Sequence, residues 1–190
     1  LGIDSIKLRQ KNMMEVGFKD DFSKNENYFD SLNQCIAKGR EYIHWDEKQE
    51  KYKNQTGPVR RGIGMSIFWY NTAVWPISLE TSACRMVLNQ DGSIQLQVAE
   101  TEIGQGADTV FAQMASEALG IKFEDVHVIS TQDTDVTPFG TGAYASRQTY
   151  VAGFSIKQTA DLLKDKILGH AQELTRMPQA NLDIKDGNIV

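Results

Sequence analysis

The sequence predicts an α+β fold in which helices pack on a mixed or antiparallel sheet. Residues 93–98 alternate polar and apolar side chains, which is typical of a half-buried strand. Residues 107–119 carry apolar side chains at helical spacing. Another strand-like run, residues 126–130, follows this helix, so helices and strands are interspersed along the chain.

Residues 1–58 are expected to form a helical N-terminal segment. Asp4 can cap a helix over 5–13, whose last turn carries the basic residues that a helix dipole favours. Residues 15–27 are polar and predict a loop.

A second helix is expected over residues 28–43, because apolar residues lie near one face: Phe29, Leu32, Ile36 and Ile43. Cys35 should be a small core residue on this helix. The charged run 46–55 predicts a short solvated helix that Gly57-Pro58 ends.

Residues 59–190 are expected to form an α+β domain. The β-branched, aromatic and aliphatic residues of 61–88 predict two strands with a break at Trp75-Pro76. Residues 89–92 have the composition of a turn, so the strand before them and the strand at 93–98 should form a hairpin.

The C-terminal half should contain the helix 107–119 with Gly120 as its left-handed cap, and the strand 126–130. A glycine-rich loop over 131–146 and a long helix over 147–174 should follow. A last hairpin pairs 182–184 with 188–190. Since the chain lacks a starting Met and ends within this hairpin, we expect an internal fragment of a longer protein.

Composition excludes several classes of function. With 41% hydrophobic and 24% charged residues the chain has globular composition. The net charge of −5 and the absence of a basic stripe argue against nucleic acid as a partner. No apolar run approaches the roughly 20 residues of a membrane span. Two cysteines cannot build a disulfide framework, an iron–sulfur site or a zinc site, which favours a cytoplasmic location.

Gly104, Gln105 and Gly106 lie between a strand and a helix N-terminus. Two glycines permit a tight turn and leave the glutamine amide projecting, and the helix N-terminus offers N–H groups to an anion. A plain turn without ligand is the alternative. The pattern is not a dinucleotide fingerprint, because Thr109 stands where the third glycine belongs.

A second loop of small residues runs into the next predicted helix, and its candidate binding residues are Thr141, Gly142, Ala143, Tyr144, Ala145, Ser146 and Arg147. Small residues permit close approach of a bulky ligand, hydroxyl and N–H groups can donate to phosphate, and Arg147 could add a charged fork. Two such loops favour one shared anion or cofactor site, with the loops side by side. The acids near them are expected to be ordinary strand-end and loop residues: Glu100, Glu102, Asp108, Asp133 and Asp135.

These motifs resemble the molybdenum hydroxylases of the xanthine dehydrogenase and aldehyde oxidase type. Residues 89–111 are similar to the family's strand and Gly-Gln-Gly loop, and 142–147 to its second cofactor loop. Residues 128–139 resemble the intervening segment of bacterial xanthine dehydrogenase molybdenum-binding subunits, and 1–12 the helix after the substrate-pocket arginine loop.

The resemblance implies a partial molybdopterin-binding domain over 59–190, with a molybdenum–molybdopterin cofactor that bacteria often use as its cytosine dinucleotide. It implies that Gln105 acts in catalysis by placing its amide near the apical molybdenum oxygen. Gly104 and Gly106 would shape that loop, and residues 141–147 would line the pterin and its phosphate. The expected activity is purine hydroxylation with oxygen from water, with electrons passing to iron–sulfur and FAD domains or subunits.

The sequence also departs from the family pattern. The glutamate base, the phenylalanine-bearing glycine loop and the pocket arginine loop are absent, so we expect the remaining parts of the subunit to supply them and the fragment alone to be inactive. Two alternatives stay open: an aldehyde, carbon monoxide or nicotinate-type branch of the family, and a non-enzymatic anion-binding module.

Overall fold

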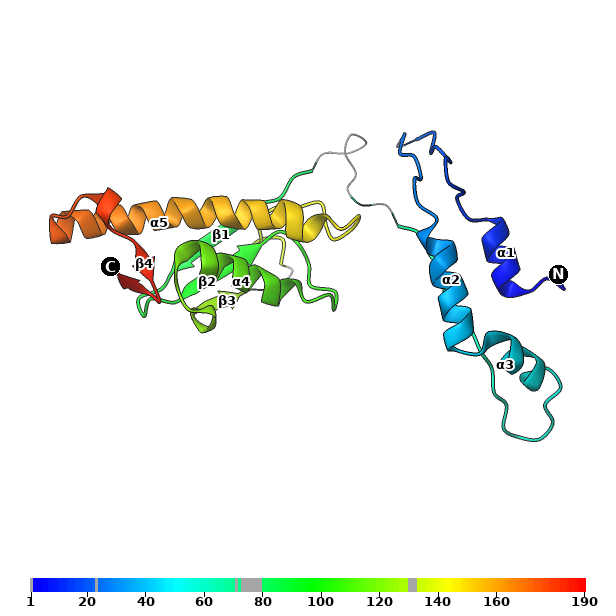
Figure 1. Ribbon diagram of the computed structural model, residues 1–190. Helices are drawn as coiled ribbons and strands as arrows, with labels where there is room; N and C mark the ends of the chain where they lie inside the picture. Colours follow the sequence, from blue (N-terminus) through cyan, green and yellow to red (C-terminus); the bar gives the residue numbers. More distant parts are fainter. Residues whose placement is uncertain (1, 23, 71, 73–79, 130–132) are drawn as a thin grey trace. The chain divides into compact units, whose positions relative to one another are not determined.

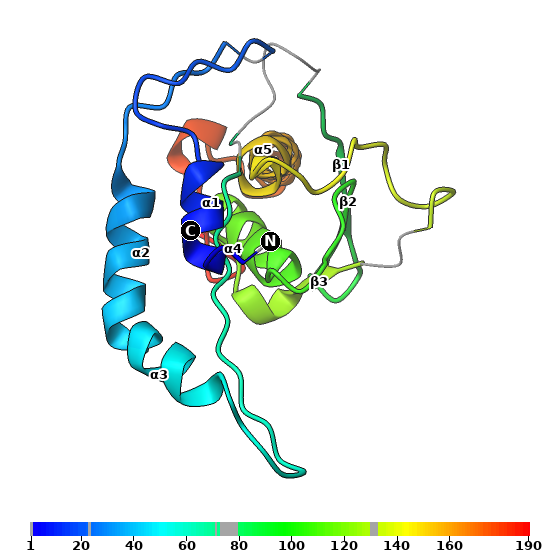
Figure 2. The same cartoon turned by 90° about the vertical axis from the view of Figure 1, so that its right-hand side faces the viewer.

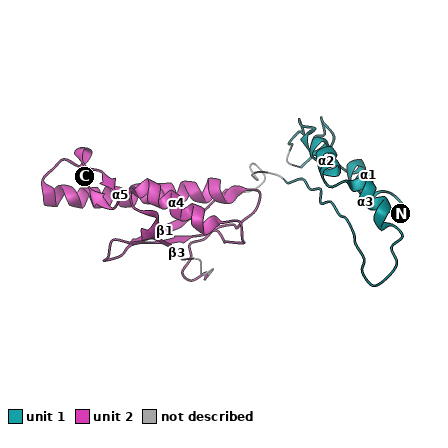
Figure 3. Ribbon diagram, turned by 60° about the horizontal axis from the view of Figure 1, so that its bottom comes forward, with its two compact units in different colours: residues 1–70 teal, residues 71–190 magenta. Residues whose placement is uncertain are grey.

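The computed structural model describes residues 2–22, 24–70, 72, 80–129 and 133–190 (Figure 1). The chain divides into two compact units, residues 1–70 and 71–190 (Figure 3). Within the described ranges, no helix has the length and apolar character that crossing a membrane requires.

The first unit holds three helices: α1 (Ser5–Lys11), α2 (Ser31–Tyr42) and α3 (Trp45–Tyr52). The Asp4 carboxylate accepts hydrogen bonds from the N–H groups of Ile6 and Lys7, so the predicted cap of α1 is confirmed. The helices enclose a small apolar cluster around Ile6, Ile36 and Trp45.

The prediction for Cys35 is wrong, because this side chain is exposed. On α2 the buried residue is Ile36, and consecutive helical positions differ by about 100° around the axis, so the neighbouring side chain points away from the cluster. Phe29 precedes the helix and is 73% exposed, so it lies outside the expected apolar face.

The strand expected at the start of 61–88 is also wrong as far as residue 70, because none of these residues is in a strand. Ile63, Met65 and Ile67 alternate with more exposed residues, but they pack against the helical cluster and not in a sheet. One-sided burial of an extended segment gives the same alternation as a strand. These residues belong to the first compact unit, which extends to residue 70, and the domain boundary suggested at 58/59 stays a prediction. The expected break at Trp75-Pro76 lies outside the described residues.

The second unit contains a three-stranded sheet of β1 (Cys84–Leu88), β2 (Ile94–Val98) and β3 (Val126–Val128). The central strand β2 pairs antiparallel with β1, as Met86↔Leu96 shows, and parallel with β3. The mixed sheet and the hairpin through residues 89–92 are therefore confirmed.

Two helices, α4 (Ala107–Leu119) and α5 (Gly153–Thr175), pack on one face of the sheet (Figure 2). Their shared core contains Leu96, Val98, Phe111, Ala152 and Ile156. The remaining elements are short: η1 (Phe123–Asp125), the π-helical turn η2 (Gln148–Ala152), η3 (Gln179–Asn181), β4 (Ile184–Lys185) and β5 (Asn188–Ile189). The predicted last hairpin is confirmed by the antiparallel pairing of β4 and β5.

Two glycines hold elements close together. Gly120 ends α4 at φ 79°, and a Cβ there would lie 2.0 Å from the carbonyl oxygen of Ile184. At Gly153 a Cβ would lie 2.8 Å from Sδ of Met114, so α5 approaches α4 closely at its first turn. The close packing of Gly153 on α4 fixes the position of the first turn of α5. The loop that precedes α5 therefore lies near the end of β2.

Candidate functional site

The Gly104–Gly106 loop is organised by Glu102. The N–H groups of Gly104, Gly106 and Asp108 donate to the Glu102 carboxylate at 2.6, 3.1 and 3.1 Å. Both glycines have positive φ, 97° and 89°, which other residues adopt at a cost. The backbone hydrogen bonds, chiefly that from Asp108, lower the pKa of Glu102.

This arrangement corrects the expectation that the N–H groups at the N-terminus of α4 are free to bind an external anion. The chain's own carboxylate accepts from the loop and from the first turn of the helix, and it supplies the negative charge that the helix dipole favours. Glu102 is therefore more than the ordinary strand-end acid that the sequence suggested.

The side chain of Gln105 lies in a hydrogen-bond network. Its Oε1 accepts from the N–H of Ile103 at 2.7 Å. Its Nε2 donates to the carbonyl oxygen of Thr101 at 3.2 Å and to Oε1 of Gln148. Gln148 in turn donates from Nε2 to the same Thr101 oxygen at 2.7 Å. Because Gln148 directly follows the second loop, these contacts place the end of that loop beside the first loop, as predicted.

The second loop has unusual backbone geometry where it enters the helix. Ala145 and Ser146 have φ values of 49° and 56°, in the left-handed region that residues with a Cβ disfavour. The π-helical turn η2 follows directly. Such conformations cost about 1–3 kcal/mol per residue and concentrate at functional sites.

Arg147 holds this loop from within. Its side chain is fully buried, donating from Nε to Glu80 at 2.8 Å and from one terminal nitrogen to Glu100 and to the Gly142 carbonyl oxygen, both at 2.8 Å. The other terminal nitrogen donates to the carbonyl oxygen of Thr81. The guanidinium thus joins the loop to the end of β2 and to the segment before β1.

These contacts give Arg147 a different role from a fork for phosphate, since its donors already face this chain's own carboxylates and carbonyls. Burial by itself lowers the pKa of Arg147, but the hydrogen bonds and charges of Glu80 and Glu100 outweigh it and raise the pKa. Glu100 is fully buried in this ion pair, so its role is structural.

A pocket of about 420 Å³ opens where the loop from Thr134 to Gly140 meets the end of β2, and its lining includes Thr101, Thr137 and Phe139. A Cβ at Gly140 would lie 2.4 Å from the Ala99 Cβ, so only glycine allows this approach. The Thr137 hydroxyl is buried without a hydrogen-bond partner within the described structure. Unpaired buried hydroxyls are uncommon, which marks this wall of the pocket as unusual.

The pocket is lined by none of the predicted residues, neither Gly104–Gly106 of the first loop nor residues 141–147 of the second. Ser146 lines a separate hollow with Glu80, Tyr150 and Phe154 at the start of α5. Thr141 is exposed, whereas Gly142, Ala143 and Tyr144 are half-buried. Sequence reasoning missed Thr137 and Gln148, because nothing in their spacing distinguishes them from neighbouring polar residues.

Elsewhere in the second unit, the described residues provide no cluster of three or more His, Cys, Asp and Glu side chains able to hold a metal ion, and the same is true of the first unit. Burial raises the pKa of the Cys84 thiol to about 11, so this group is a protonated neighbour of the core and not a thiolate ligand.

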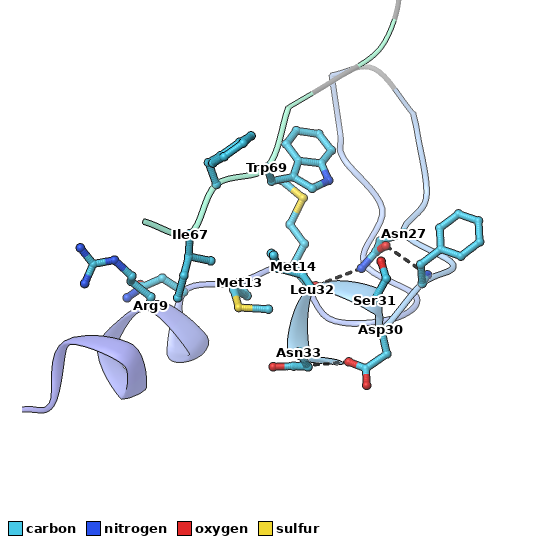
Figure 4. A pocket seen from close by; sticks show the side chains of 13 residues that line it. Arg9, Met13, Met14, Asn27, Asp30, Ser31, Leu32, Asn33, Ile67 and Trp69 are labelled. Carbon is cyan, nitrogen blue, oxygen red and sulfur yellow. Dashed lines mark hydrogen bonds between the residues drawn. The ribbon is translucent and has the colours of Figure 1, made fainter. Parts of the chain in front are cut away.

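The first unit has a pocket of its own, of about 400 Å³ (Figure 4). Met13, Leu32, Ile67 and Trp69 form part of its wall, and Arg9 lies at its edge. It contains none of the residues that the sequence singled out for binding.

The family described as molybdopterin cofactor-binding domain matches residues 38–190. The xanthine dehydrogenase molybdenum-binding subunit of Escherichia coli O157:H7 is 44% identical over 190 residues, which is 100% of this chain and 25% of the relative. The carbon monoxide dehydrogenase large chain of Afipia carboxidovorans is 29% identical over 96% of this chain and 24% of its own length. The chain thus spans about a quarter of the length of these relatives.

Solved structures agree with the fold. Reconstituted CO dehydrogenase from Oligotropha carboxidovorans aligns with a TM-score of 0.51 and 27% identity, covering 54% of this chain and 13% of that chain. Quinoline 2-oxidoreductase from Pseudomonas putida 86 aligns with a TM-score of 0.51 and 27% identity, over 57% and 14% of the respective chains. Just over half of this chain therefore has a fold that recurs in these two solved structures.

Proposed function

Since this chain belongs to the molybdopterin cofactor-binding domain family, we propose that it is part of the molybdenum-binding subunit of a xanthine dehydrogenase-type hydroxylase. The proposed activity is hydroxylation of hypoxanthine or xanthine with oxygen from water. Electrons would pass to iron–sulfur and FAD domains or subunits, and the remaining parts of the same subunit would complete the site.

The observation that carries the proposal is the meeting of the two loops. Gln105 and Gln148 link the loops through the Thr101 carbonyl oxygen, and Arg147 fixes the second loop to Glu100. Two loops that come from distant parts of the sequence and lie side by side could together bind one large, polar ligand.

The residues present fit a pterin cofactor. The pocket beside the loops offers the unpartnered Thr137 hydroxyl and the aromatic side chain of Phe139, and Gly140 lets this wall pack closely against Ala99. A polar heterocycle with hydrogen-bonding edges can use such groups, whereas a simple inorganic anion would have no use for the aromatic wall.

When bound, the molybdenum–molybdopterin, in bacteria often a cytosine dinucleotide, would supply the redox chemistry. This chain would hold it with Gly104, Gln105, Gly106 and the loop residues 141–146. The amide of Gln105 would orient the ligand by hydrogen bonding, while Arg147 would hold the loop without touching it. The glycines would keep the backbone close to the ligand.

The test uses the full-length protein purified with its partner subunits. Molybdenum and pterin are measured, then turnover of hypoxanthine and xanthine in water enriched with heavy oxygen. We expect stoichiometric molybdenum and labelled product. Oxidation of aldehydes or carbon monoxide but not of purines would assign the protein to the aldehyde or carbon monoxide branch of the family. The carbon monoxide dehydrogenase large chain of Afipia is similar to this chain. Absence of molybdenum and pterin would leave a non-enzymatic anion-binding module.

Gln105→Ala in the same enzyme provides the residue-level test. We expect turnover to fall about 100- to 1000-fold, the range seen when one well-placed donor is removed from an active site. Loss of bound molybdenum would also support a role in the site. A variant with wild-type molybdenum content and wild-type turnover would show that Gln105 is only a turn residue.

A further inference from the structure

The structure assigns to Gln148, beyond its part in linking the two loops, the task of fixing which end of the Gln105 amide faces a ligand. This inference rests on the proposed function, in which Gln105 contacts the cofactor. It concerns a positioning residue, because Gln148 acts through Gln105 and not on the ligand itself.

The orientation of the two amides follows from the carbonyl oxygen of Thr101. A carbonyl oxygen can only accept, so the group of Gln148 that lies 2.7 Å from it must be the donating Nε2. The Gln148 Oε1 then faces the first loop, where Nε2 of Gln105 donates to it. The backbone therefore sets the orientation of Gln148, and Gln148 sets that of Gln105.

The other end of Gln105 agrees with this orientation. The N–H of Ile103 can only donate, so the atom 2.7 Å away must be Oε1 of Gln105. Consequently Oε1 is turned into its own loop, and Nε2 lies toward the second loop. An amide that is held in this way presents an N–H donor to a ligand between the loops.

The lengths of the hydrogen bonds indicate which N–H of Gln105 can change its acceptor from the protein to a ligand. Nε2 of Gln105 has two hydrogens, one directed to Gln148 and the other to Thr101 at 3.2 Å. Thr101 already accepts a shorter bond of 2.7 Å from Gln148. The longer hydrogen bond, from Gln105 to Thr101, is the weaker one, so a ligand replaces the Thr101 oxygen as its acceptor. The hydrogen bond between Gln105 and Gln148 remains.

The position of Gln148 in the chain explains how it is held. It begins the π-helical turn η2, directly after the buried Arg147. The ion pair with Glu100 ties this point of the second loop to the end of β2, close to Thr101. A rigid anchor on one side and a backbone carbonyl on the other leave the Gln148 amide little freedom.

The first experiment replaces Gln148 in the full-length enzyme with its partner subunits. Gln148→Met keeps the chain length but removes both hydrogen bonds, whereas Gln148→Glu keeps an acceptor for Gln105. We expect kcat to fall about 3- to 10-fold in Gln148→Met, with less loss in Gln148→Glu and with molybdenum content and KM near wild type. Gln113→Met, on an exposed position of α4, is the matched control and should leave all three unchanged.

Coupling to Gln105 is tested by a double-mutant cycle. In a Gln105→Ala background, Gln148→Met should lower kcat no further, because its effect passes through the missing amide. An equal loss in both backgrounds would overturn the inference, and so would unchanged kcat in the single variant. Loss of molybdenum from Gln148→Met would also overturn it, because Gln148 would then serve cofactor binding directly.

A measurement without turnover separates this inference from the proposed function. In cofactor-free full-length protein, hydrogen exchange of the Ile103 amide should accelerate about threefold or more in Gln148→Met, since Gln105 then holds that N–H less firmly. Faster exchange together with a Gln105→Ala enzyme of wild-type activity would retain the amide arrangement and reject the function of the site. Unchanged exchange would reject the arrangement itself.

Discussion

At the residue scale, most side chains of the candidate site make hydrogen bonds or ion pairs with other residues of this chain. Glu102 accepts from the backbone of the first loop, and Arg147 donates to two glutamates and two carbonyls. Gln105 and Gln148 then connect the loops. Interior contacts of this kind fix loop geometry before a ligand arrives, which reduces the ordering cost of binding.

Arg147→Met should strongly destabilise the second unit. Removing the guanidinium leaves the fully buried Glu100 without its charge partner, and breaking a buried ion pair from one side costs about 3–5 kcal/mol. Urea denaturation of the variant would measure the loss. Adding Glu100→Gln should recover part of it, because the unpaired charge is then gone; a double variant less stable than Arg147→Met would contradict this account.

Glu102→Gln should lower stability in a pH-dependent way. The folded-state pKa of Glu102 lies below its ordinary value of 4.5, so its ionised form stabilises the fold above that pH and the contribution is lost as the pH falls through the folded pKa. Thermal unfolding at several pH values should give a higher Tm for the wild type than for the variant near neutral pH. The difference in Tm should become smaller in acid. A difference that stays constant with pH would contradict the role of the charge.

At the element scale, the start of α5 carries both the strained second loop and the close contact with α4. The residues before it adopt left-handed and π-helical conformations, and the helix then continues regularly over Gly153–Thr175. The sheet supports this junction through Val98 and the core around Phe111. Packing of α5 therefore stabilises the unusual backbone at its N-terminal end.

Two glycine substitutions in α5 should differ in their effect. Gly169→Ala should raise stability by about 0.5–1 kcal/mol, because alanine favours helix and the new Cβ meets only Gln179 at 3.7 Å. Gly153→Ala should raise stability less or lower it, because its Cβ would lie 2.8 Å from Sδ of Met114 and force that side chain to move. Chemical denaturation compares the two, and an equal gain would show that the contact with α4 is loose.

At the scale of the whole molecule, the chain spans about a quarter of its relatives. The described part has no cluster of three or more metal-ligating side chains. Under the proposed function, the two loops would supply orientation and close approach, and other parts of a longer subunit would complete the site.

The isolated 190-residue chain should therefore have no hydroxylase activity. The resemblance implies that the glutamate base and the pocket arginine lie outside it. Assays with hypoxanthine and xanthine should show no product, whereas the full-length enzyme with its partner subunits, measured in parallel, should turn over. Product formation by the purified 190-residue chain would contradict the division of the site.

The sequence by itself determined the elements whose cause is local. Asp4 caps α1, residues 94–98 form a strand, although Gln97 is buried where alternation predicted exposure, and Gly120 ends α4. The two glycine-bearing loops lie at the ends of regular elements. Each depends on a few neighbouring residues, so periodicity and turn chemistry were sufficient. The family could also be identified, because the loop motifs are continuous in the sequence.

Only the tertiary structure decided which partners these residues have. Extended residues 63–67 pack on helices and not in a sheet, Glu102 occupies the helix N-terminus expected to bind an anion, and Arg147 faces Glu100, 47 positions earlier in the chain. Alternation shows that one side of a segment is buried but not against what. Charge likewise shows that a group needs a partner, and that partner is chosen by packing between residues far apart in the chain.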